Sequence, residues 1–401
     1  MHKPQDSPPA GAVTLKTVAG MSDFTPDEWR GLAGTSRDES ETSYNPFISY
    51  DFLSILEESG TVSGRSGWKP QHLRLEDASG RLIGAVACYL KSNSQGEYVF
   101  DHAWAQAYER AGGAYYPKLQ CAVPFTPATG PRIMARAEGG YELLLGGAIG
   151  LCRQLGASSL HVTFPEEAEW RRMGEAGLLL RQDQQYHWHN QGYACFEDFL
   201  AALSSSRRKT IRRERREARA GLEIEALSGR ELTEAHWDAF FAFYMDTGSR
   251  KWGRPYLNRR FFSLLGERMA DRVLLVMARR EGRWIAGALN LIGEQALYGR
   301  NWGALEHRPF LHFELCYYQA IEQAASGRPA AVTLTTGIMR AAAVRRVAPT
   351  ASRARSAMRR LSISRVNASV SSRSGSCAFM KKSCVTLSAP ESLRRILVLT
   401  G

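Results

Sequence analysis

The chain has 401 residues, of which 44% are hydrophobic and 10% aromatic, and this is enough apolar material for two hydrophobic cores. It contains no apolar run of about eighteen residues, so a membrane-spanning helix is not expected. The net charge of +12 suggests nucleic-acid binding, but residues 326–401 hold 14 of the 52 Lys and Arg residues and one of the 40 acidic residues. The preceding residues therefore carry 38 basic and 39 acidic side chains, which excludes a generally basic body.

Two features at the level of the whole chain bear on its location. Residues 1–15 hold one lysine and no apolar stretch, so we expect a disordered leader and not a signal peptide. The seven cysteines are odd in number, widely spaced and without a C-x-x-C pair, which argues against a disulfide framework or a zinc ribbon. Free thiols in a cytoplasmic protein are the plain interpretation.

Residues 16–192 are predicted to form a first α/β unit. Its opening helix, residues 24–32, has Thr25 as a candidate N-cap before Pro26. A second helix follows Asn45 and runs to Glu58. The remaining predicted elements are strands at 71–76, 82–91, 97–101, 159–163 and 178–189, and helices at 141–155 and 166–176.

Residues 193–323 are predicted to form a second α/β unit with the same order of elements. Its amphipathic helix, residues 233–245, carries Trp237, Phe240, Phe241 and Tyr244 along one side. The other predicted elements are strands at 222–227, 273–279, 284–292 and 296–302, and helices at 259–269 and 310–323.

An internal repeat supports two related units. Residues 80–87, GRLIGAVA, align with residues 282–289, GRWIAGAL, and both are predicted hairpins with a strand of small residues. The strand that ends at 101–104 is aligned with residues 300–303, where an aromatic and polar cluster recurs. The alternative is coincidence, because hairpins with glycine turns are common.

Several long motifs between about Trp29 and Gln323 resemble one known family. They are NPFISYDFLSILEESG, GWKPQHL, LKSNSQGEYVFDHAWAQAYERAGGAYYPKLQ, VPFTPATGPR, QYHWHNQGYACFEDFLAALSSSRRKTIRRERREA, TGSRKWGRPYLNRRFF and GALNLIGEQALYGRNWGALEHRPFLHFELCYYQAIEQA. The chain thus resembles the FemAB-like predicted N-acyltransferases, which have two GNAT-like units and are concerned with peptidoglycan biosynthesis or recognition. The resemblance implies an α/β fold of tandem GNAT-like units with mixed central sheets.

The resemblance stops where the basic C-terminal segment begins. Residues 324–401 are rich in Arg, Ser and Ala, and their only aromatic residue is Phe379, so they are predicted to be a low-complexity tail outside the native fold. We hypothesise a shift of reading frame near residue 324, which the gene's nucleotide sequence around that codon would test. A second unit without its native last strands would be truncated, and this chain would then be inactive or unstable.

The densest polar cluster in the first unit contains Lys91, Glu97, Asp101, His102 and Trp104. Glu97 and Asp101 are four residues apart on a predicted strand and would project from the same face, so with His102 they are the candidate catalytic acid and base. The alternative is that Asp101 and His102 make hydrogen bonds at a strand end and that Trp104 belongs to the core. Lys91 and Trp104 are predicted to bind substrate.

Further substrate-binding candidates lie on both units. Lys118, in the segment YYPK, is predicted to line the same cleft. Arg300 and Trp302 lie at a predicted strand end, and His312 and Glu314 open the next helix, where an anion would also bind favourably. Residues 300–305 match only the first half of a coenzyme A loop, so acyl-CoA and aminoacyl-tRNA, which the family resemblance implies, both stay open as the donor.

A basic helix is predicted from Arg207 to Arg219, with eight basic and two acidic residues. Arg207, Arg208, Lys209 and Arg212 are candidates for binding phosphates of tRNA or coenzyme A, and a solvated helix face is the alternative. His187 and His189 lack a third ligand at suitable spacing, so no metal site is predicted.

The sequence therefore predicts a cytoplasmic N-acyltransferase that transfers an acyl or aminoacyl group to an amine of a small molecule or cell-wall precursor. Its cleft would lie between the units. A non-catalytic module that binds such a ligand on a degenerate GNAT fold is the first alternative, and an RNA-binding protein driven by the tail is the second.

Overall fold

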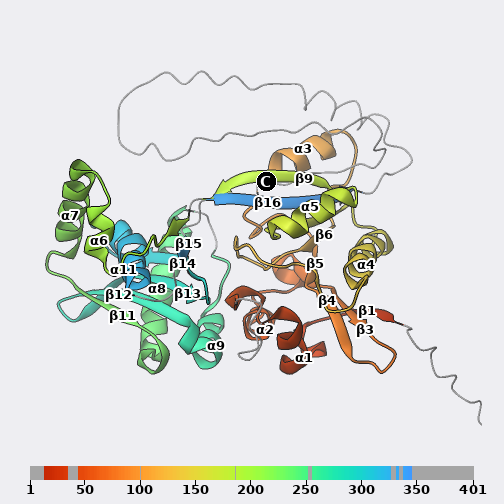
Figure 1. The fold of residues 1–401 in the computed structure, drawn as a ribbon, viewed down its shortest axis with the longest axis horizontal. Helices are drawn as coiled ribbons and strands as arrows, with labels where there is room; N and C mark the ends of the chain where they lie inside the picture. Colours follow the sequence, from red (N-terminus) through yellow and green to blue (C-terminus); the bar gives the residue numbers. More distant parts are fainter. Residues whose placement is uncertain are drawn as a thin grey trace, which may run out of the picture.

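The computed structural model describes residues 13–34, 44–99, 101–185, 187–251, 255–326, 331–333 and 337–345. These residues form two α/β units that lie side by side, the first at the right of Figure 1 and the second at the left. The described strands belong to three sheets, two of which are built mainly from the first unit. The fold class predicted from the sequence, two α/β units with mixed central sheets, is confirmed.

The first unit contains a four-stranded sheet in the order β1-β3-β4-β7 and a six-stranded sheet in the order β2-β5-β6-β8-β16-β9. The strands of these two sheets are β1 (Thr14–Val18), β2 (Trp68–Pro70), β3 (His72–Glu76), β4 (Leu82–Val86), β5 (Cys88–Lys91), β6 (Lys118–Cys121), β7 (Met134–Ala135), β8 (Ser159–Thr163), β9 (Leu179–Gln185) and β16 (Gly337–Arg345). The helices are α1 (Pro26–Ala33), α2 (Tyr50–Glu58), α3 (His102–Arg110), α4 (Gly140–Gln154) and α5 (Glu167–Glu175). β1 begins inside the segment expected to be a disordered leader.

The second unit has one six-stranded sheet in the order β10-β15-β14-β13-β12-β11. Its strands are β10 (Trp188–His189), β11 (Glu223–Leu227), β12 (Val273–Arg280), β13 (Arg283–Ile292), β14 (Ala296–Ala304) and β15 (Ala331–Thr333). The helices are α6 (Phe196–Ala201), α7 (Ser205–Arg219), α8 (Glu234–Lys251), α9 (Arg259–Met269), α10 (Leu311–Phe313), a π-helical turn at Glu314–Tyr318 and α11 (Gln319–Ala325).

Local sequence signals account for several of these elements. Thr25 caps α1 as predicted, because its hydroxyl accepts the amide of Glu28 and the Glu28 carboxylate accepts the amide of Thr25. Both predicted hairpins are present, β3–β4 and β12–β13, and their turns place Gly80 and Gly282 at φ of 83° and 76°. The repeated hairpin is thus confirmed.

The two units share a strand topology. In each of them antiparallel strands are followed by a helix and then by a strand parallel to the last one: β6 pairs with β8 and β14 pairs with β15 in this way. β6 is therefore the counterpart of β14. The predicted alignment of residues 101–104 with residues 300–303 is wrong, because Asp101 lies at the N-terminal end of α3, in the connection before β6.

Three predicted strands differ from the structure. The predicted strand 82–91 is divided into β4 and β5, which belong to different sheets. Residues 97–99 form bends and irregular loop instead of a strand, and Asp101 precedes α3, so the period-two argument for Glu97 and Asp101 does not apply. The predicted strand 178–189 is divided into β9 and β10, which belong to different sheets. A sheet assignment depends on long-range pairing, which the alternation of residues along one strand does not specify.

The units exchange strands at their boundary. β10 follows the first unit in sequence but pairs with β15 of the second unit's sheet. β16, near the end of the described chain, pairs on one edge with β8 and on the other with β9 of the first unit, and Figure 1 shows it beside β9. Both β15 and β16 lie beyond residue 323, where the sequence analysis ends the second unit. Residues 346–401 lie outside the described part, so the predicted nature of that tail is not tested.

A continuous apolar core joins the units. One buried cluster contains residues of both, and Phe52 of α2 meets Phe261 of α9 edge to face at 6.0 Å between ring centroids. Phe47 meets Tyr298 of β14 in the same way at 5.1 Å. Separate clusters pack under α4 in the first unit and under α11 in the second. The shared aromatic core fixes the position of one unit against the other.

Candidate functional site

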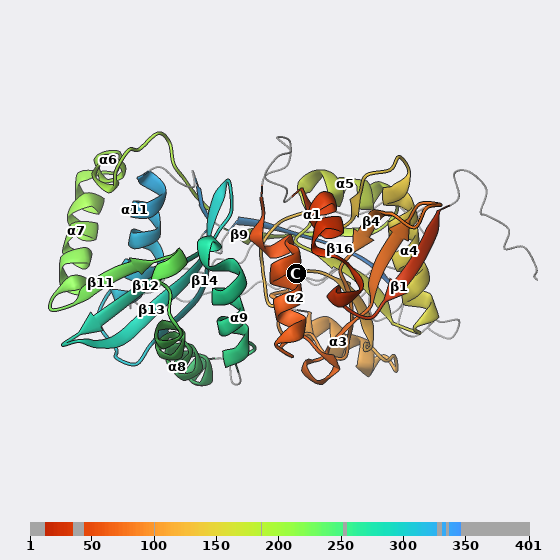
Figure 2. The same ribbon diagram turned by 90° about the horizontal axis from the view of Figure 1, so that it is seen from below.

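A cavity of about 370 Å³ opens where the two units meet. The first unit contributes a loop after β5 and the start of α3, and the second contributes the end of α8, the segment before α9 and the middle of β14. Figure 2 shows α3 and α8 on the same side of the molecule, one on each unit. The residues that line the cavity are Ser94, Gln95, Gly96, Tyr98, Val99, His102, Tyr244, Thr247, Gly248, Pro255, Tyr256, Arg300, Asn301 and Trp302.

The loop after β5 is held in place by hydrogen bonds to its main-chain carbonyl groups. The carbonyl of Gln95 accepts from the indole of Trp68 at 3.1 Å and from Nζ of Lys91 at 3.1 Å. The carbonyl of Gly96 accepts the amide of Phe125 at 3.1 Å. Gly96 has φ of +76°, and a Cβ there would lie 2.4 Å from the Phe125 ring, so only glycine fits. This wall of the cavity is therefore preformed.

A buried cluster of four charges lies beneath this loop. Nζ of Lys118 donates to Glu97 Oε2 at 2.8 Å, to Asp101 Oδ2 at 2.5 Å and to the hydroxyl of Ser94 at 2.8 Å. Nζ of Lys91 lies 3.9 Å from Glu97 Oε1 and 3.6 Å from the centroid of the Trp68 ring. The structure thus brings together Lys91, Glu97 and Asp101 of the predicted cluster, and adds Lys118, which was predicted only to line the same cleft.

The protonation of the cluster follows from its pairing. Burial raises the pKa of Asp101, but the Lys118 ammonium outweighs this effect and the pKa falls to about 2. Burial raises the pKa of Glu97 above its ordinary value, and Lys118 and Lys91 offset only part of that rise. Burial lowers the pKa of Lys118, yet its two carboxylate partners raise it overall. Glu97 and Asp101 are therefore counter-ions of Lys118, and neither lines the cavity.

Lys91 makes the stability of the protein depend on pH. Its side chain is fully buried, and burial lowers its pKa from 10.5 to about 7. Below pH 7 the folded state holds a costly buried charge; between pH 7 and 10.5 the unfolded state binds more protons, so stability rises with pH. We expect the free energy of unfolding of the wild type, relative to Lys91→Met, to rise between pH 7 and 9.5, by at most about 1.4 kcal/mol per pH unit. Urea unfolding of both proteins across this range measures the difference, and parallel pH profiles would refute the assignment.

The two other predicted residues of this region lie apart from the ion pairs. His102 is exposed, begins α3 and lines the cavity. Trp104 is half-buried against a small aromatic cluster that contains Tyr108, Tyr115 and Tyr116. Trp104 thus packs as the alternative interpretation expected, while His102 alone of the three predicted catalytic residues reaches the cavity. The catalytic roles stay a prediction.

Arg300 and Trp302 of β14 lie in the opposite wall. Arg300 is half-buried, its guanidinium donates to the carbonyl of Phe125 across the unit boundary, and burial lowers its pKa. Trp302 lines the cavity and meets the ring of His312 at 5.2 Å, edge to face. His312 itself lies behind Trp302 and does not line the cavity. Two of the substrate-binding candidates in the second unit are thus in the site.

Glu314 serves a different purpose from the one predicted. It is fully buried, and both of its oxygens accept from Arg215 of α7 at 3.0 Å, while Gln319 donates at 2.8 Å. This bidentate pair ties α7 to the π-helical turn. Glu314 is absent from the cavity lining, so its predicted substrate contact is unsupported by its position.

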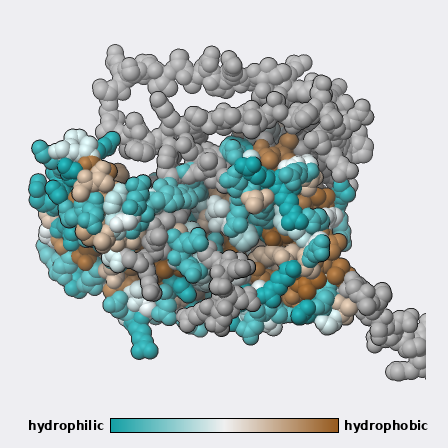
Figure 3. All heavy atoms as spheres, in the orientation of Figure 1, coloured by the Kyte–Doolittle hydropathy of each residue, from teal (hydrophilic) through white to brown (hydrophobic). Residues whose placement is uncertain are grey.

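The four predicted phosphate-binding residues all lie on α7, at the outer end of the second unit (Figure 1). Arg208 donates to the carbonyls of Ala201 and Leu203 and thereby caps α6, and Arg212 pairs with Glu197 at 2.6 Å. Arg207 and Lys209 are exposed. Figure 3 shows mostly hydrophilic side chains at this end of the molecule. None of the residues of α7 lines the cavity, and the role of this helix in binding phosphate stays a prediction.

Sequence reasoning missed three tyrosines of the cavity. Tyr98, Tyr244 and Tyr256 line it, and Tyr244 accepts the amides of Tyr256 and Leu257 at 3.0 and 3.1 Å. Tyr256 stacks on Phe125 at 5.1 Å between centroids. Tyr256 belongs to the motif TGSRKWGRPYLNRRFF, which carried part of the family resemblance. A single sequence does not show, however, that this segment lies opposite residues 94–99.

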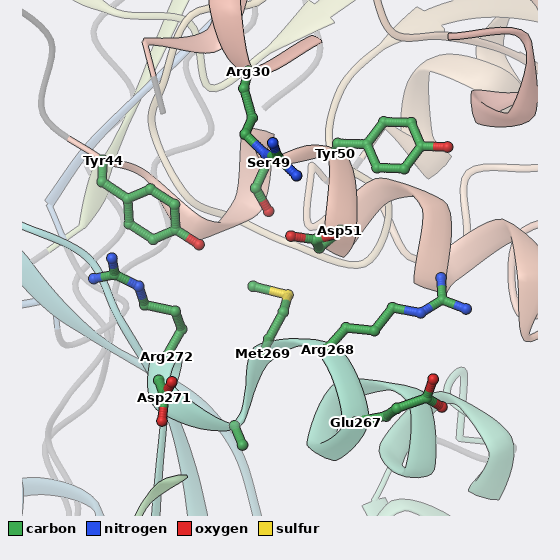
Figure 4. Close-up of a pocket in the computed structure, with 11 residues that line it drawn as sticks. Arg30, Tyr44, Ser49, Tyr50, Asp51, Glu267, Arg268, Met269, Asp271 and Arg272 are labelled. Atoms are coloured by element: carbon green, nitrogen blue, oxygen red, sulfur yellow. The ribbon is translucent and has the colours of Figure 1, made fainter. Parts of the chain in front are cut away.

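A second, larger groove of about 470 Å³ also lies between the units (Figure 4). Its upper rim comes from the region of α1 and α2, with Arg30, Tyr44 and Asp51, and its lower rim from the end of α9. Three arginines and three carboxylates line it, so its charges balance. None of the site residues predicted from the sequence lies in it.

Across the described residues, no helix is both long and apolar enough to cross a membrane. Within the same part of the chain, no three His, Cys, Asp or Glu side chains gather as a metal site would require.

Comparison with known proteins identifies the family. The model of the FemAB-like family, described as peptidoglycan biosynthesis/recognition, matches residues 20–333. Similar solved structures include FemX, at 11% identity and a TM-score of 0.46 over 78% of this chain and 87% of that chain. A tandem GNAT protein from the clavulanic acid biosynthesis pathway matches at 10% identity and 0.44, over 83% and 98%. The structure of L-PGS from Bacillus licheniformis matches at 11% and 0.44, over 75% and 81%.

No curated protein matches the chain. The family model covers more than half of the sequence and extends ten residues beyond Gln323, into β15. The protein therefore belongs to the FemAB-like family of peptidoglycan biosynthesis/recognition.

Proposed function

We propose that the protein is a cytoplasmic N-acyltransferase that transfers an acyl or aminoacyl group to an amine of a cell-wall precursor. The observation that carries this proposal is the cavity of about 370 Å³ to which both units contribute walls, in a chain of the FemAB-like family. A site shared by two rigidly packed units can hold two reactants in a fixed orientation, which is a large part of the catalysis of a bimolecular transfer.

Acyl transfer to an amine needs a group that accepts a proton from the amine and donors that stabilise the developing oxyanion. Among the described residues that line the cavity, His102 is the one His, Asp or Glu side chain. We assign it the role of proton acceptor. The amide of Asn301 and the hydroxyls of the cavity tyrosines are suited to donate to the donor's carbonyl oxygen.

The test combines donors, acceptors and one matched pair of variants. The full chain is incubated with acetyl-CoA or aminoacyl-tRNA and a panel of amines, and mass spectrometry detects the acylated product. We expect His102→Gln to lower kcat by about a hundredfold or more, because general-base catalysis contributes about 10²–10⁴. His307→Gln, which changes an exposed histidine outside the cavity lining, should leave kcat unchanged. Full activity of His102→Gln would refute the assignment of the base.

A non-catalytic binding module is the second candidate, and one observation favours it. Two of the three predicted acid/base residues, Glu97 and Asp101, are buried and ion-paired with Lys118, which leaves few groups in the site able to move a proton. If no donor supports transfer while an acceptor binds in the cavity, the binding module is the correct description.

A further inference from the structure

The cavity has an unusual balance of charge. None of its described lining residues is Asp or Glu, whereas Arg300 and His102 both face it. Glu97 and Asp101 lie beneath the wall, outside the lining, and are paired with the ammonium groups of Lys118 and Lys91. The pKa of Tyr244 is raised by burial to about 12, so its phenol is neutral near pH 7. The electrostatic potential inside the cavity is therefore positive.

Arg300 is the source of most of this potential. It forms no ion pair with any residue in the described ranges, and the groups that act on its charge are the phenols of Tyr98 and Tyr244. One of its N–H groups donates to the carbonyl of Phe125, and its guanidinium lies 5.6 and 5.8 Å from the ring centroids of Phe47 and Tyr98. A guanidinium has five N–H donors, so several are left for another acceptor. A cation removed from water without a counter-ion is costly unless a ligand supplies the anion.

The remaining wall is aromatic. Tyr98, Tyr244, Tyr256 and Trp302 line the cavity together with Arg300, and two of these rings are fixed by hydrogen bonds or stacking. Flat rings present their faces to planar or apolar groups. The cavity thus has one anion-binding point beside a surface for an uncharged planar or apolar moiety.

We propose that Arg300 is the receptor for an anionic group, carboxylate or phosphate, on one of the two reactants, and that the aromatic wall holds the uncharged part next to it. The description of the ligand as a reactant rests on the proposed function. The binding of an anionic group by Arg300 can be tested separately from acyl transfer. The cavity should bind anionic ligands better than neutral ligands of the same shape and should reject cationic ones.

Three isosteric probes test the claim without any need for turnover. 4-Aminobenzoate, 4-aminobenzamide and 4-aminobenzamidine share one ring and one amine and differ in charge, and phenyl phosphate separates phosphate from carboxylate. We expect calorimetry to show that one of the two anions binds at least about tenfold more tightly than the amide, and that the amidine binds most weakly. Arg300→Gln should abolish the preference for the anion and leave the binding of the amide unchanged.

Arg308→Gln is the matched control, because Arg308 is also half-buried and also donates to a main-chain carbonyl, that of Ala220, but lies outside the cavity. It should keep the preference. Equal affinities of the three aminobenzene probes, tighter binding of the amidine, or no binding of any probe would overturn the proposal. Binding with the expected order but no acyl transfer would refute the proposed function and leave this inference standing.

Thermal melting distinguishes an arginine that binds a ligand from one that mainly stabilises the fold. Because Arg300 lacks a counter-ion in the free protein, Arg300→Met should melt at the same temperature as the wild type or higher. Arg215→Met, which leaves the buried Glu314 carboxylate without its partner, should melt lower. A strong fall in the melting temperature of Arg300→Met would show that its bond to Phe125 is structural and would overturn the proposal.

Discussion

Lys118→Met should lower the free energy of unfolding by about 3–5 kcal/mol, because the substitution leaves two carboxylates buried without their counter-ion. Lys118, Glu97 and Asp101 all have fully buried side chains. One oxygen of each carboxylate, Glu97 Oε1 and Asp101 Oδ1, has no hydrogen-bond partner among the described residues even with the lysine present. The loss would be a large part of the roughly 5–15 kcal/mol by which a folded domain is stable.

Urea unfolding of three variants tests this expectation. Lys16→Met is the control, because Lys16 pairs with Glu76 at 2.5 Å but is 53% exposed, and such surface pairs contribute about 0–1 kcal/mol. The triple change Lys118→Met, Glu97→Gln, Asp101→Asn should recover part of the lost stability, since no charge is then buried unpaired. Equal losses for Lys118→Met and Lys16→Met would show that the cluster does not carry the stability assigned to it.

Lys118→Met should also alter the loop that lines the cavity. Lys118 holds the hydroxyl of Ser94, which lines the cavity and also bonds to Tyr116 at 2.7 Å. The loop after β5 would lose one of its anchors, while the bonds of Lys91 and Trp68 to Gln95 would stay. The cluster therefore links the stability of the first unit to the shape of the site, which makes Lys118 a positioning residue.

Deletion of residues 327–401 should destabilise the first unit as well as the second. β16 lies between β8 and β9, and β9 has no other strand partner in the described part of the sheet. β15 likewise joins β14 to β10. A main-chain hydrogen bond contributes about 1 kcal/mol net, so the loss of a strand paired on both edges removes much of the total stability.

Deletion of residues 346–401 is the matched control, because it keeps every described strand pair. We expect it to leave the urea midpoint unchanged, while the longer deletion lowers the midpoint and speeds amide exchange in β9. If the two deletions are equally stable, the native fold ends before β15, in agreement with the predicted end of the second unit at residue 323, and β16 is not part of it.

The sequence by itself determined the local elements and the family. The capping box at Thr25, the glycine turns of the two hairpins and the apolar periodicity of α4 depend on neighbours in the chain, so a single sequence reveals them. The clustering of Lys91, Glu97 and Asp101 was also predicted, although the reason given for it, a shared strand face, was wrong.

Only the tertiary structure decided what those residues do. Lys118 comes to Glu97 and Asp101 because β6 pairs with β5, and Tyr256 comes opposite Gly96 because the two units pack through a shared aromatic core. Arg300 reaches Phe125 across the unit boundary for the same reason. The exchange of β10 and β16 depends on main-chain pairing over long separations, which no pattern of side chains along one segment specifies. Chain neighbours therefore fix the elements, whereas the charge and shape of the cavity arise from contacts between segments far apart in sequence.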